Sequence, residues 1–416
     1  CRGCAAKLAA GPLVAALARL DSEQGASLAP DSPSKDPVVC RDPLQGWGAL
    51  ATPIDAPVVG EGADGGWLLQ SVDGFPALVD DPWLNARLTT VHACSDLWAS
   101  AARVESVQAV VTLPQAATWL QEEWLFQTLA GVRSVLESLG ARLLGGHTLE
   151  GRDGAGLALA LTVNGRVAPP EPADATPGDC PSSGPHAVQS GRAGTPWCKG
   201  PLRAGDVLVL SRPIGSGVLF AAAMAGAARP EWIDTALETM QQSQAPLVEL
   251  LGAHGCHACT DVTGFGLLGH LGEMLAPPPE QCGLQVELDG DAIPAFPGVR
   301  ELLTRGYAST LAPSNSTALR LLGDAVHLVV RPEGPGAGTP AGGGVETGAI
   351  PVSSGSAPTA RREQSPPRQP LHGLLIDPQT CGPLLAAIPA EQSAEALMAM
   401  RRAGFLRATV IATVHG

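Results

Sequence analysis

Lysine is almost missing from this chain of 416 residues: its 26 basic residues include only Lys7, Lys35 and Lys199. Because arginine is used nearly everywhere else, each lysine is present either by chance or for a chemical reason. Charged residues make up only 16% of the chain, and the net charge is −14. An acidic surface repels nucleic-acid phosphates and anionic lipids, so we expect neither a nucleic acid nor a membrane as partner.

Long apolar runs are also missing. The longest charge-free stretch of small and apolar residues, 214–228, is too short to cross a bilayer. No secretory signal precedes the first motif. Ten cysteines are sparse compared with disulfide-rich secreted domains, which favours a reducing compartment. We therefore expect a cytoplasmic protein. An organelle is the alternative, because the chain begins with Cys1 rather than Met and we expect something upstream of it.

The composition predicts two folded domains separated by low-complexity segments. A chain of this length with 45% hydrophobic residues can form two cores. Residues 168–200 and 332–370 are rich in Gly, Pro and Ser and lack apolar periodicity, so we expect them not to pack. We therefore predict an N-terminal domain at 1–166, an insertion at 167–200, and a C-terminal domain at 201–416 with a disordered insertion at 332–370.

Helical and strand patterns alternate in both halves, which predicts an α+β (two-domain α/β) fold. One helix is predicted to start at Asp81, as N-cap, followed by Pro82. The predicted strands are 67–72, 157–163 and 206–210, and the predicted helices are 82–98, 115–139, a short one after Gly217, and 232–251.

Four aspartates lie where a predicted element begins or ends: Asp55, Asp73, Asp96 and Asp261. Asp96 follows His92 by four residues, so both lie on one face of the helix. Carboxylates gathered from separate elements are suitable ligands for Mg²⁺. The alternative for each aspartate alone is an N-cap or a solvated turn.

Glycines and cysteines give weaker signals. Residues 145–148 and 264–266 are predicted glycine turns, and neither fits a P-loop or a dinucleotide-binding fingerprint. Cys256 and Cys259 could be half of a zinc site with the distant Cys1 and Cys4, but buried incidental thiols are the favoured interpretation. Lys7 lies three residues after Cys4, where an ammonium would favour the reactive thiolate.

Together these motifs resemble the selenophosphate synthetase (selenide, water dikinase) family, whose fold is the aminoimidazole ribonucleotide synthetase-like (PurM-like) fold. The resemblance covers most of the chain outside the low-complexity segments. Its most specific part is Thr260-Asp261-Val262-Thr263-Gly264-Phe265-Gly266-Leu267-Leu268-Gly269-His270. The other matching segments are Cys4-Ala5-Ala6-Lys7, Asp55-Ala56-Pro57-Val58, Ser71-Val72-Asp73-Gly74-Phe75, Val79-Asp80-Asp81-Pro82, Ala93-Cys94-Ser95-Asp96-Leu97, Gly145-Gly146-His147-Thr148 and Asp377-Pro378-Gln379-Thr380.

The resemblance implies an enzyme that converts ATP, selenide and water to selenophosphate, AMP and orthophosphate. By the same resemblance, Cys4 is the catalytic thiol and Lys7 its essential neighbour, which also contacts phosphate or selenium. The implied ligands of the Mg²⁺ cofactor are Asp55, Asp96 and Asp261, and Asp73 is an implied ATP–metal contact. Gly146, His147 and Thr148 are implied to line the nucleotide pocket across a homodimer interface.

The sequence departs from the family pattern at Ile54, Gly74, Cys381 and Pro383. The resemblance also implies an upstream oxidoreductase domain, dependent on flavin and NADH, because Val111-Thr112-Leu113-Pro114 and His92 resemble the fused branch of the family. Two alternatives are a kinase or synthetase of the same fold with another substrate, and a catalytically impaired nucleotide-binding module of a fused oxidoreductase. Cys4 with Lys7 argues against the first, and the four aspartates argue against the second.

Overall fold

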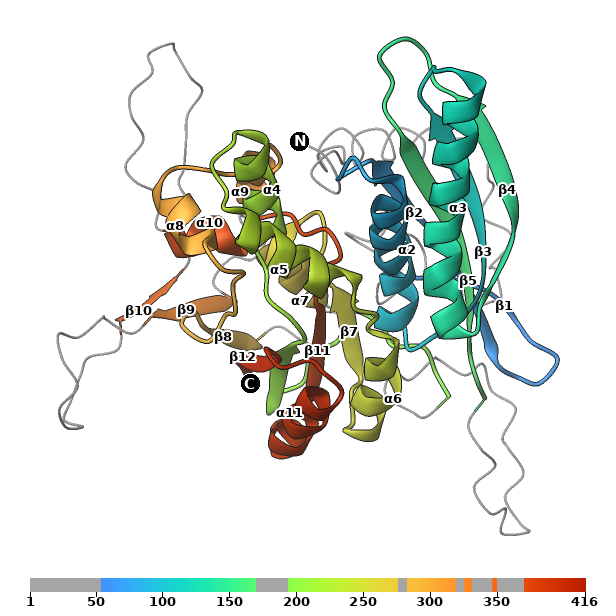
Figure 1. The fold of residues 1–416 in the computed structure, drawn as a ribbon. Helices are drawn as coiled ribbons and strands as arrows, with labels where there is room; N and C mark the ends of the chain where they lie inside the picture. Colours follow the sequence, from blue (N-terminus) through green and yellow to red (C-terminus); the bar gives the residue numbers. More distant parts are fainter. Residues whose placement is uncertain (1–53, 170–193, 276–282, 319–324, 331–345, 350–369) are drawn as a thin grey trace, which may run out of the picture.

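Two β-sheets, each packed against helices, organise the chain (Figure 1). The structure is a computed structural model, and it describes residues 54–169, 194–275, 283–318, 325–330, 346–349 and 370–416. The first sheet forms an N-terminal unit and the second a C-terminal unit. This arrangement of helices and sheets confirms the predicted α+β class.

The N-terminal sheet has five strands within the described residues, in the order β1-β2-β5-β3-β4. Only β3 and β4 pair in parallel, because helix α3 connects them as a crossover. Along β3 and β5, buried residues alternate with more exposed ones, as expected when helices cover one face of a sheet. The strands are β1 (Val58–Glu61), β2 (Trp67–Pro76), β3 (Arg103–Leu113), β4 (Arg142–Glu150) and β5 (Ala158–Val167).

Helices α2 (Pro82–Ala99) and α3 (Thr118–Leu139) pack on the same face of this sheet. Helix α2 begins where predicted: the Asp81 carboxylate accepts the Leu84 N–H at 2.7 Å, and Pro82 occupies the first turn. Helix α3 ends at Gly140, whose φ of 66° is the left-handed conformation that glycine adopts readily. These caps explain where α2 begins and where α3 ends.

The C-terminal sheet has seven strands within the described residues, in the order β10-β9-β8-β12-β6-β11-β7. Its centre is covered on both faces: every residue of β6 is buried, Asp206 included. The strands are β6 (Asp206–Leu210), β7 (Ala258–Asp261), β8 (Gln285–Asp289), β9 (Val326–Val330), β10 (Glu346–Ala349), β11 (Leu384–Pro389) and β12 (Thr409–His415).

Short helices surround this sheet (Figure 1). They are α4 (Ser216–Met224), α5 (Pro230–Gln241), α6 (Ala245–Ala253), α7 (Gly266–Leu275), α8 (Val299–Thr304), α9 (Ala312–Ala318), α10 (Pro370–Leu375) and α11 (Ser393–Arg402), with a 3₁₀ turn at Ala390–Gln392.

Helix α2 lies between the two units. On one side it contacts β2, β3 and β5, and on the other it contacts β7, α5 and α6 of the C-terminal unit. Most of its residues are consequently buried, including polar ones such as Thr89, His92 and Ser95. A helix buried on all sides is typical of a central position, and this one brings its side chains to the junction of the units.

Several predicted elements are confirmed within a few residues: the strands at 157–163 and 206–210 and the helices at 82–98 and 115–139. The predicted strand at 67–72 continues to Pro76, so Asp73 lies inside β2 and does not end it. The single helix predicted at 232–251 is wrong. The chain leaves the helical path at residues 242–244, where Arg212 binds the carbonyls of Thr239 and Gln242, each at 2.9 Å.

The expectation that the low-complexity segments do not pack is wrong at two places. Trp197, Cys198 and Lys199, at the end of the predicted insertion, are buried with exposures of 5%, 6% and 5%. Residues 346–349 form β10, which pairs antiparallel with β9. The rest of these two segments lies outside the described residues, except for 168–169, 194–196, 200 and 370. For Lys199 composition missed the packing because its partners, Asp55 and Glu273, lie far away in the sequence.

Candidate functional site

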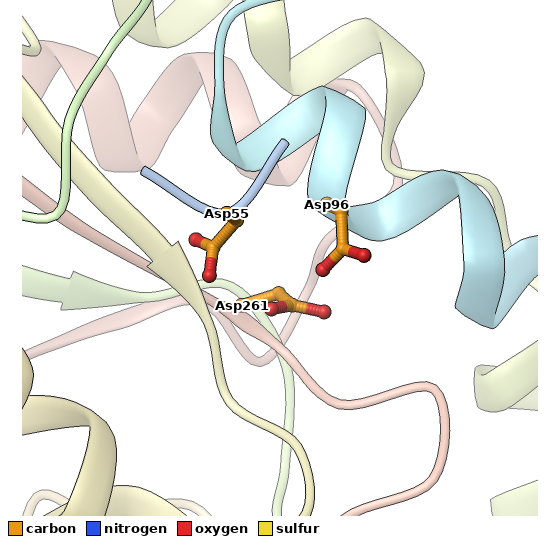
Figure 2. Close-up of side chains that lie close together, drawn as sticks. All are labelled: Asp55, Asp96 and Asp261. Carbon is orange, nitrogen blue, oxygen red and sulfur yellow. The ribbon is translucent and has the colours of Figure 1, made fainter. Parts of the chain in front are cut away.

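Three aspartates from three different elements meet at the junction of the two units (Figure 2). Asp55 precedes β1, Asp96 lies in the last turns of α2, and Asp261 is the last residue of β7. One carboxylate oxygen from each lies within 4.8 Å of the others. No other group of three or more acidic, histidine or cysteine side chains in the described part of the chain comes this close.

Each of the three carboxylates is held by a donor on one oxygen. The hydroxyl of Ser71 donates to Asp96 Oδ2, and the hydroxyl of Ser95 donates to Asp261 Oδ2. The Lys199 ammonium lies 2.8 Å from Asp55 Oδ1. Asp55 Oδ2 is buried and has no hydrogen-bond partner among the described residues. A buried oxygen without a partner is costly, which indicates that a ligand belongs there.

The electrostatics of the site favour a cation. Burial raises the pKa of Asp55 to about 6; Lys199 counteracts this shift and Asp261 adds to it. Burial, and then the charge of Asp261, raises the pKa of Asp96 well above its usual range. Carboxylates that repel one another in a buried site are stabilised in their charged form by a divalent ion. Hard oxygen ligands of this kind fit Mg²⁺.

Asp73, the fourth predicted aspartate, lies against a buried histidine. The backbone N–H of Cys381 donates to His92 Nδ1 at 3.2 Å, so the ring proton of neutral His92 lies on Nε2. That nitrogen lies 3.1 Å from Asp73 Oδ2. His92 and Asp96 both face β2, as their spacing on the helix predicted. A loop of the C-terminal unit therefore fixes the histidine that contacts an aspartate of the N-terminal unit.

The two predicted glycine turns differ in the structure. Residues 145–148 are not a turn but part of β4, an exposed strand at the edge of the sheet. They are extended because they pair with β3: Gly146 lies opposite Ala109, and a Cβ there would be 1.7 Å from the Ala109 carbonyl oxygen. The turn at 264–266 is confirmed, and Gly266, with φ of 71°, lies too close to the backbone of Ile376 for a side chain.

The departures from the family pattern fit their surroundings. Ile54 is 3% exposed and part of the core. Gly74 lies against β5, where a Cβ would be 2.4 Å from Ala160 Cα. The Pro383 carbonyl accepts the Val262 N–H at 2.8 Å, next to Asp261. Each of these three residues thus has a place in the packing or hydrogen bonding of the fold.

The Asp377-Pro378-Gln379-Thr380 motif supports helix α4 rather than the three aspartates. Gln379 Oε1 accepts the Gly215 N–H at 2.7 Å and the Ser216 N–H at 3.1 Å. Asp377 Oδ2 accepts the Val218 N–H at 3.2 Å. The first N–H groups of α4 are thus satisfied by side chains from a remote part of the chain.

Cys4 and Lys7 lie outside the described residues, so the predicted catalytic pair has no structural account here. Cys256 and Cys259 are buried, free thiols. Lys199 is the site residue that sequence reasoning missed; its one signal was the rarity of lysine. Burial alone would lower the pKa of Lys199. The carboxylates of Asp55 and Glu273 outweigh this effect and raise the pKa, so the ammonium stays charged.

None of the helices in the described ranges is both long enough and apolar enough to span a membrane.

Two family models match the sequence. The AIR synthase related protein, N-terminal domain, matches residues 53–167, and the AIR synthase related protein, C-terminal domain, matches residues 203–416. These ranges coincide with the two structural units. Asp55 and Asp96 therefore lie in the first match and Asp261 in the second.

Three curated relatives are selenide, water dikinases. That of Geobacter metallireducens is 32% identical over 248 residues, which are 60% of this chain and 62% of the relative. That of Pelobacter propionicus is 26% identical over 412 residues, 99% of this chain and 92% of the relative. That of Myxococcus xanthus is 29% identical over 408 residues, 97% of this chain and 90% of the relative. The first similarity thus spans less than two thirds of the relative, and the other two span nearly all of theirs.

Solved structures show the same fold. Thiamine-monophosphate kinase from Stenotrophomonas maltophilia has a TM-score of 0.53 and 17% identity, covering 88% of each chain. The hydrogenase maturation protein HypE of E. coli has a TM-score of 0.51 and 17% identity, covering 85% of this chain and 81% of its own. At these identities the likeness concerns the fold alone. It confirms the predicted aminoimidazole ribonucleotide synthetase-like (PurM-like) fold.

Proposed function

This chain belongs to the AIR synthase related protein family, and we propose that it is an ATP-dependent enzyme that makes selenophosphate. It would consume ATP, selenide and water and release AMP and orthophosphate. The phosphoryl-transfer part of this proposal rests on one observation. Three aspartates from both units lie close together, and one of them has a buried oxygen without a hydrogen-bond partner among the described residues. The selenium part rests on the similarity to selenide, water dikinases over nearly the whole chain.

Asp55, Asp96 and Asp261 would hold Mg²⁺ in this proposal. A bound Mg²⁺ would offset the charge of the ATP phosphates, which is most of what phosphoryl transfer requires of a protein besides positioning. Ser71, Ser95 and Lys199 would hold the three carboxylates in the geometry that Figure 2 shows. Four ionised carboxylates, Asp73 included, would otherwise repel the nucleotide.

Asp73 is the proposed further contact to ATP and metal, oriented by His92. Cys4 and Lys7 are the proposed catalytic thiol and its neighbouring ammonium, on the resemblance of their motif. The thiolate would be the reactive form, and the ammonium would favour it. The upstream oxidoreductase domain and the cytoplasmic location stay predictions.

A homodimer is also part of the proposal. Ser71 and Asp73 point to α2, so Val72 between them points to the opposite face of the sheet, which no described helix covers. Val72, Val110 and Leu149 lie on this face with exposures of 67%, 42% and 43%. Gly146, His147 and Thr148 lie on the adjoining edge strand, β4. A second copy packed here would cover the apolar face and place these three residues near its nucleotide.

Phosphorus NMR tests the reaction. Purified protein is incubated with ATP, Mg²⁺ and selenide without oxygen and under reducing conditions, and we expect a selenophosphate resonance with an equal amount of AMP. The Asp261→Asn variant serves as control. It should lose the resonance, because asparagine has the shape of aspartate but lacks the negative charge of the proposed metal ligand. ATP hydrolysis without selenophosphate would contradict the proposal in favour of another acceptor. Tight ATP binding without turnover would favour the impaired nucleotide-binding module.

A further inference from the structure

Lys199 is a buried cation that joins the two structural units. Its ammonium lies 2.8 Å from Asp55 Oδ1, in the N-terminal unit, and 2.7 Å from Glu273 Oε2, on α7 of the C-terminal unit. The side chains of Lys199 and Asp55 are only 6% and 5% exposed. Glu273 is held in turn by His270, whose Nδ1 lies 3.0 Å away. Lys199 is thus excluded from water and held in place by two carboxylates, one from each unit.

The backbone directly before Lys199 is fixed by both structural units. The Trp197 N–H donates to the Ser100 carbonyl at 3.3 Å. The Cys198 carbonyl accepts the Cys259 N–H at 2.9 Å, and Cys198 forms a parallel bridge with Ala258 of β7. The segment 197–199 thus connects the end of α2, which carries Asp96, with the strand that carries Asp261.

Ser100 connects this segment to the other two aspartates. Its hydroxyl accepts the Ala56 N–H at 3.0 Å, directly after Asp55, and donates to the Asp96 carbonyl at 2.8 Å. The residue that holds Trp197 therefore also holds the backbone beside Asp55 and the helix turn of Asp96. The segment 197–199 and Ser100 together contact each of the three aspartates or the backbone near it.

We infer that Lys199 is a positioning residue for the metal site of the proposed function, on which this inference rests. It binds Asp55 Oδ1, so Asp55 Oδ2, which has no hydrogen-bond partner among the described residues, is the oxygen that remains for a ligand. It does not touch the metal. The inference concerns the segment 197–199 as a whole, since Trp197 and Cys198 fix the backbone from which the ammonium reaches Asp55.

Two roles of Lys199 predict opposite results. If Lys199 were only a counter-charge, its removal would leave the site more negative, and a cation would bind as tightly or more tightly. If it positions Asp55, its removal weakens cation binding although the site has become more negative. Glu273 offers the matched control, because removing the charges of Lys199 and Glu273 together leaves the net charge of the cluster unchanged.

The experiment uses Mn²⁺ as the probe. Binding of Mn²⁺ in the presence of a non-hydrolysable ATP analogue is followed by electron paramagnetic resonance in the full chain, in Lys199→Met and in Lys199→Met/Glu273→Gln. We expect both variants to bind Mn²⁺ about tenfold or more weakly, the scale of a lost partner of a metal ligand. The thermal unfolding midpoint without metal should fall in the single variant and recover in part in the double variant, because the double variant removes the unpaired charge of Glu273 but not that of Asp55.

Mn²⁺ binding by the double variant within about twofold of the parent, well short of the loss expected for a ligand partner, would overturn the inference and make Lys199 a structural counter-charge. The double variant decides even if the single variant does not fold. The Asp261→Asn variant separates the two proposals. If Mn²⁺ binding by the parent does not depend on Asp261, the metal site of the proposed function fails, and the inference falls with it.

Discussion

Asp377 is a single buried residue that we expect to make the stability of the fold depend on pH. It is completely buried, and this burial raises its pKa to about 8, although the N–H of Val218 and the Gln379 amide act against the shift. The folded protein therefore keeps a proton that the unfolded chain, with the ordinary aspartate value of 3.8, has already released. Folding stability consequently falls as the pH rises from about 4 to about 8.

We expect Asp377→Asn to flatten this dependence, because asparagine has the same shape and no proton to lose. In urea unfolding between pH 5 and 8, the parent should lose up to about 1 kcal/mol per pH unit more than the variant. Asp234→Asn, on the exposed side of α5, serves as control and should follow the parent. Equal slopes for the parent and Asp377→Asn would contradict the prediction.

At this scale the sequence predicted the acidic residues but not what holds them. Asp55, Asp96 and Asp261 were predicted as one site because their motifs resemble a family, and the structure brings them within 4.8 Å. Lys199 could not be assigned, because it lies 74 residues from Glu273 and even farther from Asp55, and no local pattern records such pairings.

Helix α4 depends on residues that are remote in sequence. The N-cap residue, Gly215, has no side chain to accept the first N–H groups, and Gln379 does so instead. We expect Gln379→Ala to lower the free energy of unfolding by about 1–3 kcal/mol, because it leaves buried donors without an acceptor. Chemical denaturation measures this loss.

The matched control is Gln127→Ala, which removes a surface hydrogen bond to Glu123 within α3. It should change the free energy of unfolding by less than about 0.5 kcal/mol, as surface substitutions usually do. Losses of the same size in the two variants would mean that Gln379 is not the cap of α4.

Elements with local signals were predictable, and elements set by distant contacts were not. The start of α2 follows from Asp81 and Pro82, which act within one turn. The break between α5 and α6 has one local cause, Pro246 in the first turn of α6, and one distant cause, Arg212, whose guanidinium donates to two carbonyls at the end of α5. The strand β4 has two glycines and reads as a turn, yet pairing with β3 keeps it extended.

At the scale of the molecule, one face of the N-terminal sheet has exposed apolar side chains and is covered by none of the described helices. We expect Val110→Glu to dissociate the proposed dimer, because it places a charge in the middle of the uncovered face of the N-terminal sheet. Light scattering after size-exclusion chromatography measures the mass directly. A glutamate at Leu406, 73% exposed on the C-terminal unit, is the control and should leave the dimer intact. A monomeric parent, or a Val110→Glu variant of unchanged mass, would contradict this prediction.

The three aspartates also have a mechanical consequence. Two of them belong to one unit and the third to the other, so an ion held among them, as in the proposed function, would act as a clamp between the two units. Its binding free energy would then add to the free energy that holds the two units together. The gain would be about 2.7 kcal/mol when the concentration of free ion is a hundred times its dissociation constant. The cell's supply of the ion would in this way set the rigidity of the molecule, before any substrate arrives.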